Sequence, residues 1–262
     1  MLFLLSPAKK LDYDSPLAAD YPFEQPLFVK QAIELIDVLK TKSEQDVADL
    51  MKLSESLATL NVERYQQWAP RFDQSNSRQA ILAFNGDVYE GLEASTLNKS
   101  QLEWTNDHVL ILSGLYGVLR PMDLMRPYRL EMGTRLATPK GKNLYEFWDS
   151  QIADFINASL AEHKQQVVIN LASEEYFKAV KKSTLKYPVV QCVFKEERDG
   201  VYKIISFSAK RARGLMCRYA IENGIDHLDG LKDFSQEGYA YDEASSTENS
   251  LVFLRPDQRK TK

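Results

Sequence analysis

The fold is decided by YPVVQCVFKEERDGVYKIISF, residues 187–207, in which two apolar runs flank a short polar connection. The runs Tyr187–Phe194 and Val201–Phe207 are rich in β-branched and aromatic residues, and Glu197-Arg198-Asp199-Gly200 joins them. Asp-Gly between two such runs is a strong signal for a β-hairpin, because both turn positions favour positive φ angles. The sequence therefore predicts one antiparallel pair of strands here.

Other apolar runs predict further strands, and helical segments lie between them. Strands are expected at Leu2–Leu5, Ala80–Phe84, Val109–Leu112 and Val167–Leu171. Helical periodicity covers residues 26–70, with Ser43 as a cap, and continues around Tyr145–Leu160. No repeat or linker divides the chain. These patterns predict an α+β (mixed α/β) fold, a single domain over residues 1–262 with a mixed, partly antiparallel sheet flanked by helices.

Composition excludes several classes of protein. Only Cys192 and Cys217 are present, too far apart for a CxxC motif, so neither a disulfide framework nor a zinc knuckle is expected. The three histidines have no metal-ligand spacing, and there is no Walker loop or GxGxxG, so no metal or cofactor is predicted. The apolar N-terminal run is far too short to span a bilayer. We therefore expect a cytoplasmic protein without membrane association.

Charge is distributed unevenly along the chain. The whole chain carries a net charge of −4, yet residues 176–218 carry eleven basic residues against three acids, a net of +8. Residues 109–140 form a second positive block with a net of +3. Crowded like charges repel one another unless an anion meets them, so a basic patch on an acidic protein favours a phosphorylated or polyanionic partner.

A basic helix is predicted within the first block, from a cap at Ser208 to a stop at Gly224. At 100° per residue, its cations gather on one side and its apolar residues on the other. Gly214 lies within the basic side, which suggests that something approaches the backbone closely. A solvated amphipathic helix is the simpler interpretation, but lysines upstream favour a DNA-binding surface. The residues assigned to it are Lys178, Lys181, Lys182, Lys210, Arg211, Arg213, Gly214 and Arg218.

The second positive block contains a glycine turn, Gly114-Leu115-Tyr116-Gly117. Two glycines this close permit a tight turn whose amide groups point outward, an arrangement that accepts phosphate. Alternatively, the glycines only let a strand turn beneath a packed helix. The residues assigned to a phosphate turn are Gly114, Tyr116, Gly117, Arg120, Arg126 and Arg129. Glu174 and Glu175 could place a carboxylate at a strand-end site, but the simpler interpretation is that they are acids of a first helical turn after a Ser173 cap; no catalytic residue is assigned.

Six blocks of the chain carry a resemblance to a known family. They are Leu5-Ser6-Pro7-Ala8-Lys9, Phe84-Asn85-Gly86-Asp87-Val88-Tyr89, the segment 112–121, the segment 127–133, Asn170-Leu171-Ala172-Ser173 and Lys210-Arg211-Ala212-Arg213-Gly214. In this order and spacing they closely resemble the bacterial YaaA family of peroxide-stress response proteins. The resemblance implies a cytoplasmic protein that limits free iron and oxidative DNA damage during hydrogen peroxide stress.

The resemblance also implies a positively charged cleft and a helix-hairpin-helix-like element that binds DNA. By position, that hairpin falls at Leu112 to Val118. The leading hypothesis is therefore a DNA-binding stress protein that holds duplex or branched DNA with little sequence specificity. The alternative is an enzyme acting on a nucleotide or a nucleic-acid base, because the Lys9 loop is similar to that of YaaA-like proteins associated with nucleotide modification. Its phosphate pocket would contain Lys9, Asn85 and the segment Gly114–Arg120.

Overall fold

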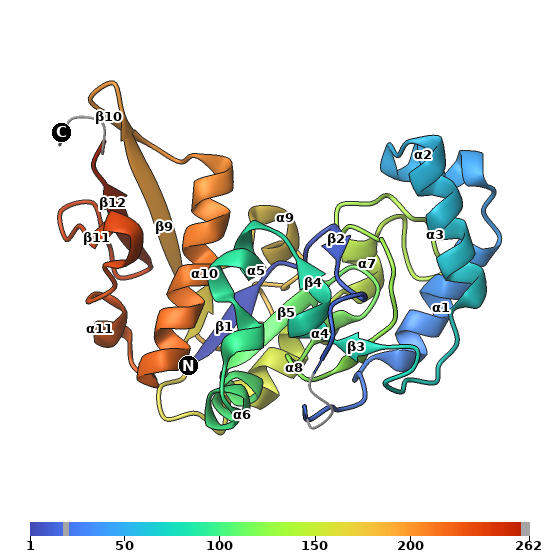
Figure 1. The fold of residues 1–262 in the computed structure, drawn as a ribbon, viewed down its shortest axis with the longest axis horizontal. Helices are drawn as coiled ribbons and strands as arrows, with labels where there is room; N and C mark the ends of the chain where they lie inside the picture. Colours follow the sequence, from blue (N-terminus) through green and yellow to red (C-terminus); the bar gives the residue numbers. More distant parts are fainter. Residues whose placement is uncertain (18–20, 258–262) are drawn as a thin grey trace.

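The central sheet is built around β1 (Leu2–Leu5), all four residues of which are buried. β1 pairs in parallel with β5 (Val109–Ser113) on one side and with β8 (Val168–Asn170) on the other. Runs that are apolar on both faces are typical of parallel strands covered on both sides. The strand order is β11-β12-β9-β8-β1-β5-β6 in this computed structural model, which describes residues 1–17 and 21–257 (Figure 1).

Antiparallel pairs make the sheet mixed, as the sequence predicted. β9 (Val189–Arg198) lies parallel to β8 and to β12 (Ser250–Arg255) but antiparallel to β10 (Val201–Lys203). β6 (Gly117–Leu119) and β11 (Ala240–Tyr241) are antiparallel to β5 and β12, respectively. Two small ladders lie apart from this sheet: β2 (Lys10–Leu11) with β4 (Phe84–Asn85), and β3 (Arg78–Gln79) with β7 (Leu124–Met125).

The predicted hairpin is present between β9 and β10. Its turn residues Asp199 and Gly200 both adopt positive φ angles, 53° and 80°. β10 ends at Lys203, however, and the apolar residues that follow it lead into a helix rather than continuing the strand. The prediction of a strand reaching Phe207 is therefore wrong at its end.

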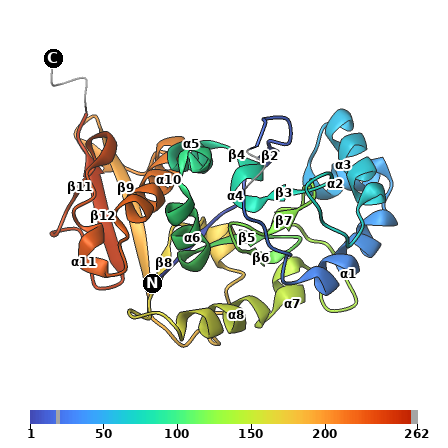
Figure 2. The ribbon, with the colours of Figure 1, turned by 60° about the horizontal axis from the view of Figure 1, so that its bottom comes forward.

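Helices cover both faces of the sheet (Figure 2). One face carries α5 (Asp87–Leu92), α6 (Lys99–His108) and α10 (Ser206–Asn223), and the other carries α7 (Leu144–Trp148) and α8 (Gln151–Leu160). Three helices gather at one end of the molecule: α1 (Val29–Lys40), α2 (Glu44–Met51) and α3 (Glu55–Gln67). The short helices are α4 (Ala80–Ala83), α9 (Glu174–Phe177) and α11 (Leu228–Leu231). None of the described helices combines the length and apolarity needed to cross a membrane.

Helix caps agree with the sequence in part. The Ser43 side chain accepts a hydrogen bond from the Asp46 amide and forms a capping box, and Gly224 ends α10 in the left-handed conformation. Ser208, by contrast, lies inside α10, which begins two residues earlier. The apolar run at 80–84 is also not the predicted strand. Its first four residues form α4, since a short apolar run alone does not distinguish a buried strand from a buried helical turn.

The predicted helical hairpin at Leu112–Val118 is wrong, because this segment is the β5–β6 turn. Its glycines are needed for packing. A Cβ atom on Gly114 would lie 2.2 Å from the Leu130 carbonyl oxygen, and one on Gly117, whose φ is +67°, would meet the Trp148 ring. The turn is buried throughout, so it offers no exposed amides to a phosphate. In the described chain, α2 and α3 are two helices joined by a tight turn, in which Lys52 adopts the left-handed conformation.

Candidate anion-binding cleft

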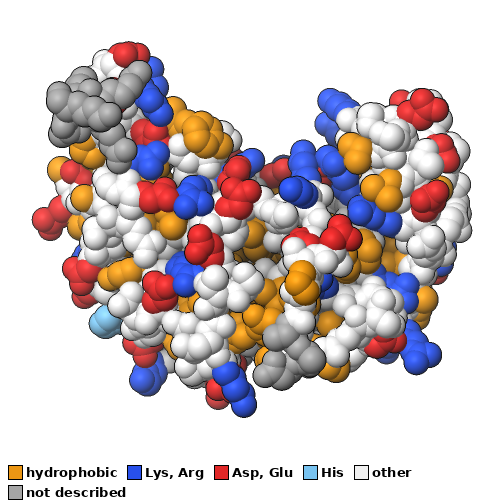
Figure 3. All heavy atoms as spheres, in the orientation of Figure 1, with side chains coloured by type: hydrophobic (Ala, Val, Ile, Leu, Met, Phe, Trp, Pro, Cys, Tyr) orange, Lys and Arg blue, Asp and Glu red, His pale blue; other side chains and the backbone are white. Residues whose placement is uncertain are grey.

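A cleft lies beyond the carboxyl ends of β1 and β8. The loop Ser6–Lys10 follows β1, and Ser173 follows β8 to begin α9, so parallel pairing brings both segments to one edge of the sheet. Together with β4, α5 and α10 they line a cavity of about 460 Å³. Ligands of open α/β sheets bind at this edge. Figure 3 shows a broad hollow between the β9–α10 side of the molecule and the α1–α3 side, with Lys and Arg side chains along it and some Asp and Glu side chains among them.

Cations outnumber carboxylates in the lining of this cavity. The lining cations are Lys9, Lys10, Arg129, Lys210 and Arg213, and the carboxylates are Asp87, Glu131 and Glu175. The predicted pocket pair Lys9 and Asn85 is brought together here, since Asn85 of β4 pairs with the residue after Lys9. Two residues of the predicted DNA-binding surface, Lys210 and Arg213, also line the cavity.

Glu131 holds two of these cations in place. Its carboxylate lies 2.9 Å from Lys9 Nζ and 3.0 Å from an Arg129 guanidinium nitrogen. Arg129 Nε is buried and has no hydrogen-bond partner among the described residues. Glu131 therefore does not satisfy all the donors of this guanidinium. A buried donor without a partner costs free energy, which a bound ligand oxygen would recover.

Arg213 differs from Lys9 and Arg129 in having no acidic partner among the described residues of the cleft. It is half-buried on α10, and within residues 1–17 and 21–257 its guanidinium makes no hydrogen bond and no ion pair. Burial lowers the pKa of Arg213, although arginine stays charged at neutral pH. A guanidinium presents five donors suited to carboxylate or phosphate oxygens. Arg213 thus offers a cleft-facing cation that has no counterion among the described residues.

Tyrosines and serines form the neutral part of the lining. Burial raises the pKa values of Tyr89, Tyr128 and Tyr176 well above the ordinary value, so all three stay protonated. The Tyr89 hydroxyl donates to the Ser6 carbonyl oxygen at 3.0 Å. The Ser6 hydroxyl oxygen accepts from the Ser173 amide at 2.8 Å, which joins the β1 and β8 loops. These contacts fix the pocket floor without adding charge.

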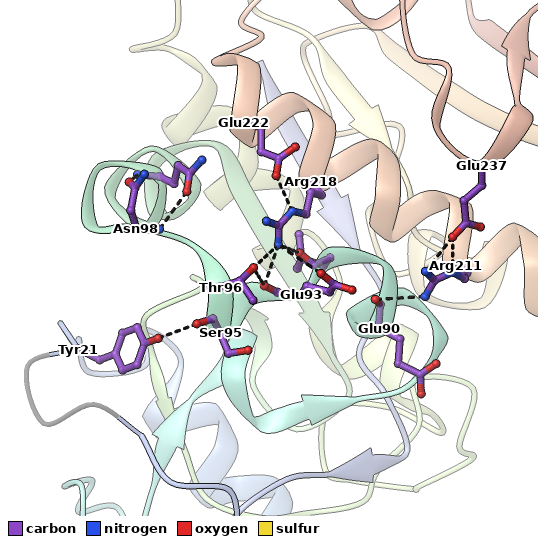
Figure 4. A network of polar contacts seen from close by, with 12 residues as sticks. Tyr21, Glu90, Glu93, Ser95, Thr96, Asn98, Arg211, Arg218, Glu222 and Glu237 are labelled. Atoms are coloured by element: carbon purple, nitrogen blue, oxygen red, sulfur yellow. Dashed lines mark hydrogen bonds and ion pairs between the residues drawn. The ribbon is translucent and has the colours of Figure 1, made fainter.

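The predicted basic surface does not face solvent as a stripe. Arg218 is only 17% exposed; its guanidinium donates to the Leu92 and Glu93 carbonyl oxygens and lies 2.8 Å from Glu222 (Figure 4). Arg211 pairs with Glu237 at 2.8 Å and donates to the Glu90 carbonyl oxygen. Both arginines therefore attach α10 to its neighbours, and their charges are already neutralised.

Gly214 packs against protein rather than facing a ligand. A Cβ atom there would lie 1.8 Å from the Val88 carbonyl oxygen, and one on Gly91 of α5 would lie 2.4 Å from the Arg211 carbonyl oxygen. The two glycines let the backbones of α5 and α10 approach each other. The close approach that the sequence indicated at Gly214 is therefore real, but the object that approaches is α5.

The three upstream lysines also lie outside the cleft lining. Lys178 Nζ lies over the Tyr145 ring at 4.9 Å, Lys181 pairs with Asp149 at 2.5 Å, and Lys182 lies over the Phe177 ring. α9 and the turn after it point the side chains of these lysines towards α7 and Phe177. They therefore do not join Lys210 and Arg213 in the cleft lining, although all of them belong to one positive block of the sequence.

Arg120 and Arg126 have structural partners instead of a phosphate site. Arg120 pairs with Glu24 and, at 2.8 Å, with the fully buried Asp123. Arg126 donates to the Gln67 and Arg71 carbonyl oxygens, which connects β7 to the end of α3. Neither residue lines the cavity, so the structure does not bring Arg120 to Lys9 and Asn85.

The buried carboxyl group of Asp123 makes the free energy of unfolding depend on pH. Burial raises its pKa to about 6, against the opposing effect of the Arg120 hydrogen bonds. Because the folded-state pKa exceeds the unfolded value of about 4, the stability that this carboxyl contributes is present below about pH 4 and lost as pH rises towards 6. The destabilisation caused by Asp123→Asn is therefore expected to be greatest near pH 4 and to shrink by on the order of 1–3 kcal/mol at neutral pH. Urea unfolding of both proteins across this range measures it, and a pH-independent difference would contradict it.

No metal centre is visible in the part of the chain that the structure describes, where no three His, Cys, Asp or Glu side chains are grouped to hold an ion. The predicted absence of a bound metal or cofactor stays a prediction. Both cysteines are buried, and burial raises the pKa of each thiol to about 12. Thiolate is the reactive form, so neither cysteine is suited to react with peroxide in the folded protein.

Sequence reasoning missed Glu131 and favoured a helix-capping interpretation of Glu175 over a place in the site. Glu131 lies in one of the blocks that carry the family resemblance but was not assigned a role there. Glu175 follows the Ser173 cap as predicted, and its side chain also accepts a hydrogen bond from the Gly133 amide at 2.9 Å. No local sequence pattern predicts either contact. The one available signal was that several of the quoted blocks follow strand ends, which indicates that they meet at one edge of the sheet.

The fold and the site define a mixed α/β protein with a basic ligand cleft at the carboxyl edge of its parallel strands. Residues 1–245 match the family described as peroxide stress protein YaaA. A UPF0246 protein of Bordetella petrii is 63% identical over 255 residues, covering 97% of this chain and 99% of that protein. UPF0246 proteins of Bordetella avium and a Polaromonas species are 62% and 61% identical, covering 97% of this chain and 99% and 98% of those proteins. The chain therefore belongs to the YaaA family of peroxide stress proteins.

Proposed function

We propose that this peroxide stress protein binds DNA in its cleft and thereby limits iron-dependent oxidative damage to that DNA. The observation that carries the proposal is Arg213, a half-buried cleft cation with no counterion within the described residues. Lys210, one turn earlier on α10, and Lys10, across the cavity, likewise have no ion pair there. Three unpaired cations around one cavity provide a site for the phosphate groups of a polyanion.

Phosphate recognition explains why little sequence specificity is expected. Contacts to phosphate oxygens position a protein on DNA but do not distinguish one base from another. The hollow of Figure 3, with cations along it, supports an extended partner such as duplex or branched DNA rather than a small anion alone. The partner is therefore DNA recognised mainly through its backbone.

Salt dependence provides the test of this proposal. Each phosphate neutralised by a cation contributes a slope of about −0.9 to a plot of log affinity against log salt concentration. Three unpaired cleft cations therefore give an expected slope of about −2.7. Fluorescence anisotropy of a labelled duplex, titrated with the protein over a series of potassium chloride concentrations, measures it.

Two outcomes would contradict this assignment. An affinity that does not change with salt concentration would refute binding of the DNA backbone by these cations. A slope near −6 would mean that all seven cations of the predicted basic surface contact phosphate, which is incompatible with the internal pairing of Arg211 and Arg218. Arg211→Gln serves as the control, because the charge it removes is already neutralised by Glu237.

A second candidate function is favoured by the enclosed part of the site. Lys9 and Asn85 line a cavity of about 460 Å³, within the range of small-molecule sites, and Glu131 places a carboxylate beside Lys9. This arrangement suits an enzyme that acts on a nucleotide or a nucleic-acid base, with Lys9 on the phosphate. Incubation with nucleotides followed by mass spectrometry separates the two functions, because only the enzyme would convert them.

A further inference from the structure

An apolar surface lies next to the proposed DNA cleft. Four large apolar side chains are exposed between β10 and the first turn of α10, and together they are termed the β10 rim: Val201, Tyr202, Ile204 and Phe207. Phe207 is 64% exposed, more than any other large apolar side chain in the described residues. In Figure 3, apolar side chains gather over the upper end of α10, on the wall of the hollow. Contiguous exposed apolar residues mark interaction sites.

The rim continues into the unpaired cations of the cleft. Lys210 follows Phe207 by three residues on α10, so the two side chains share one side of the helix. Arg213 lies a further three residues along. Within the rim, Lys203 is exposed between Tyr202 and Ile204. The exposed ring of Phe207 therefore lies on the same side of α10 as Lys210, which lines the cavity.

Glu196, the acidic residue paired in register with Lys203, is committed to other cations. Glu196 on β9 is buried, and its carboxylate pairs with Arg198 at 2.9 Å and with Arg255. The Tyr239 hydroxyl also donates to it at 3.2 Å. Glu196 is thus committed to the contact between β9, β12 and the segment that carries Tyr239.

We infer that the β10 rim is a stacking surface for unpaired bases, so that the cleft prefers single-stranded or locally unpaired DNA to a closed duplex. This inference rests on the proposed function, that cleft cations bind DNA phosphates. Exposed aromatic rings beside cations are the combination with which proteins hold single strands, since rings stack on bases while cations follow the backbone. In a duplex the base faces are covered by neighbouring pairs, and Phe207 would have nothing to stack on.

The test compares two DNA probes of equal length, a fluorescein-labelled oligo(dT) and a labelled duplex, at one salt concentration. The wild type is expected to bind the single strand more tightly. Phe207→Ala is expected to lower single-strand affinity roughly tenfold and to leave duplex affinity unchanged. Phe207→Tyr keeps a ring for stacking and is expected to retain single-strand affinity. Phe23→Ala is the matched control, because Phe23 is 47% exposed but does not belong to the rim.

The outcomes separate this inference from the proposed function. If neither probe binds in a salt-dependent manner, the proposed function fails, and this inference fails with it. If both probes bind but Phe207→Ala changes their affinities equally or not at all, the stacking surface is refuted while the cleft assignment stands. A wild-type dimer that Phe207→Ala dissociates, measured by sedimentation without DNA, would identify the rim as an interface between protein copies and overturn the inference.

Discussion

Replacing Arg213 by glutamine is expected to lower DNA affinity roughly tenfold or more without lowering the stability of the protein. A charge-assisted hydrogen bond contributes about 1.5–3 kcal/mol, and Arg213 has donors available for such bonds in the cleft. The folded protein offers Arg213 no ion pair within the described residues, and burial lowers its pKa. Removing its charge therefore relieves a cost of folding rather than creating one. Anisotropy and urea unfolding on the same preparation measure the two effects.

Arg218 on the same helix is the matched control, with the opposite expectation. Its guanidinium donates to the Leu92 and Glu93 carbonyl oxygens and to the Thr96 hydroxyl, and it pairs with Glu222. Arg218→Gln is therefore expected to lower the free energy of unfolding by about 1–3 kcal/mol and to leave DNA affinity unchanged under conditions where the variant is folded. A loss of binding in Arg218→Gln together with normal binding in Arg213→Gln would contradict the cleft assignment.

Gly214→Ala is expected to destabilise the protein even though alanine is the better helix former. The exchange gains about 1 kcal/mol in helix propensity. The new methyl group, however, would lie 1.8 Å from the Val88 carbonyl oxygen, which belongs to helical backbone and has little freedom to move. Overpacking of this kind costs about 1–3 kcal/mol and occasionally more, so the net effect is a loss. Urea denaturation measures this loss.

A second effect of Gly214→Ala follows from the position of α10. The helix has to move away from α5 to make room, and it carries Lys210 and Arg213, so DNA affinity is expected to fall as well. Gly224→Ala is the control, because Gly224 ends the same helix with a φ of +58° and has no neighbouring atom within 4 Å of a Cβ. Gly224→Ala is therefore expected to add backbone strain but no steric overlap. Wild-type stability in Gly214→Ala would show that α5 and α10 are not in the close contact described.

Local signals in the sequence predicted the elements whose geometry is set locally. Asp199-Gly200 predicted a turn because the two residues tolerate positive φ, and both adopt it. Ser43 predicted a helix start because its side chain satisfies an amide three residues away. The segment 80–84 failed as a strand, since four buried apolar residues fit a helical turn equally well.

The site was less predictable, because its charges are paired by tertiary contacts. Arg218 donates to the Leu92 carbonyl oxygen and Arg211 pairs with Glu237, and both partners are distant in sequence. Helical periodicity contains no information about such partners. A helical-wheel projection thus assigned three arginines to one basic surface, and among the described residues Arg211 and Arg218 have acidic partners whereas Arg213 has none. Lys9 and Asn85 were predicted as a pair because their blocks matched the family, and the cavity brings them together.

Glu131, clamped between Lys9 and Arg129, means that the cavity carries a counterion of its own. A ligand reaching those two cations has to exchange places with a tethered carboxylate, whose effective concentration is far above that of free salt. Monovalent anions such as chloride are poor competitors in this exchange, whereas a chain of phosphates anchored nearby at Arg213 competes from an equally tethered position. If the proposed function holds, the ion pairs of Glu131 therefore favour polyvalent ligands over simple anions at Lys9 and Arg129.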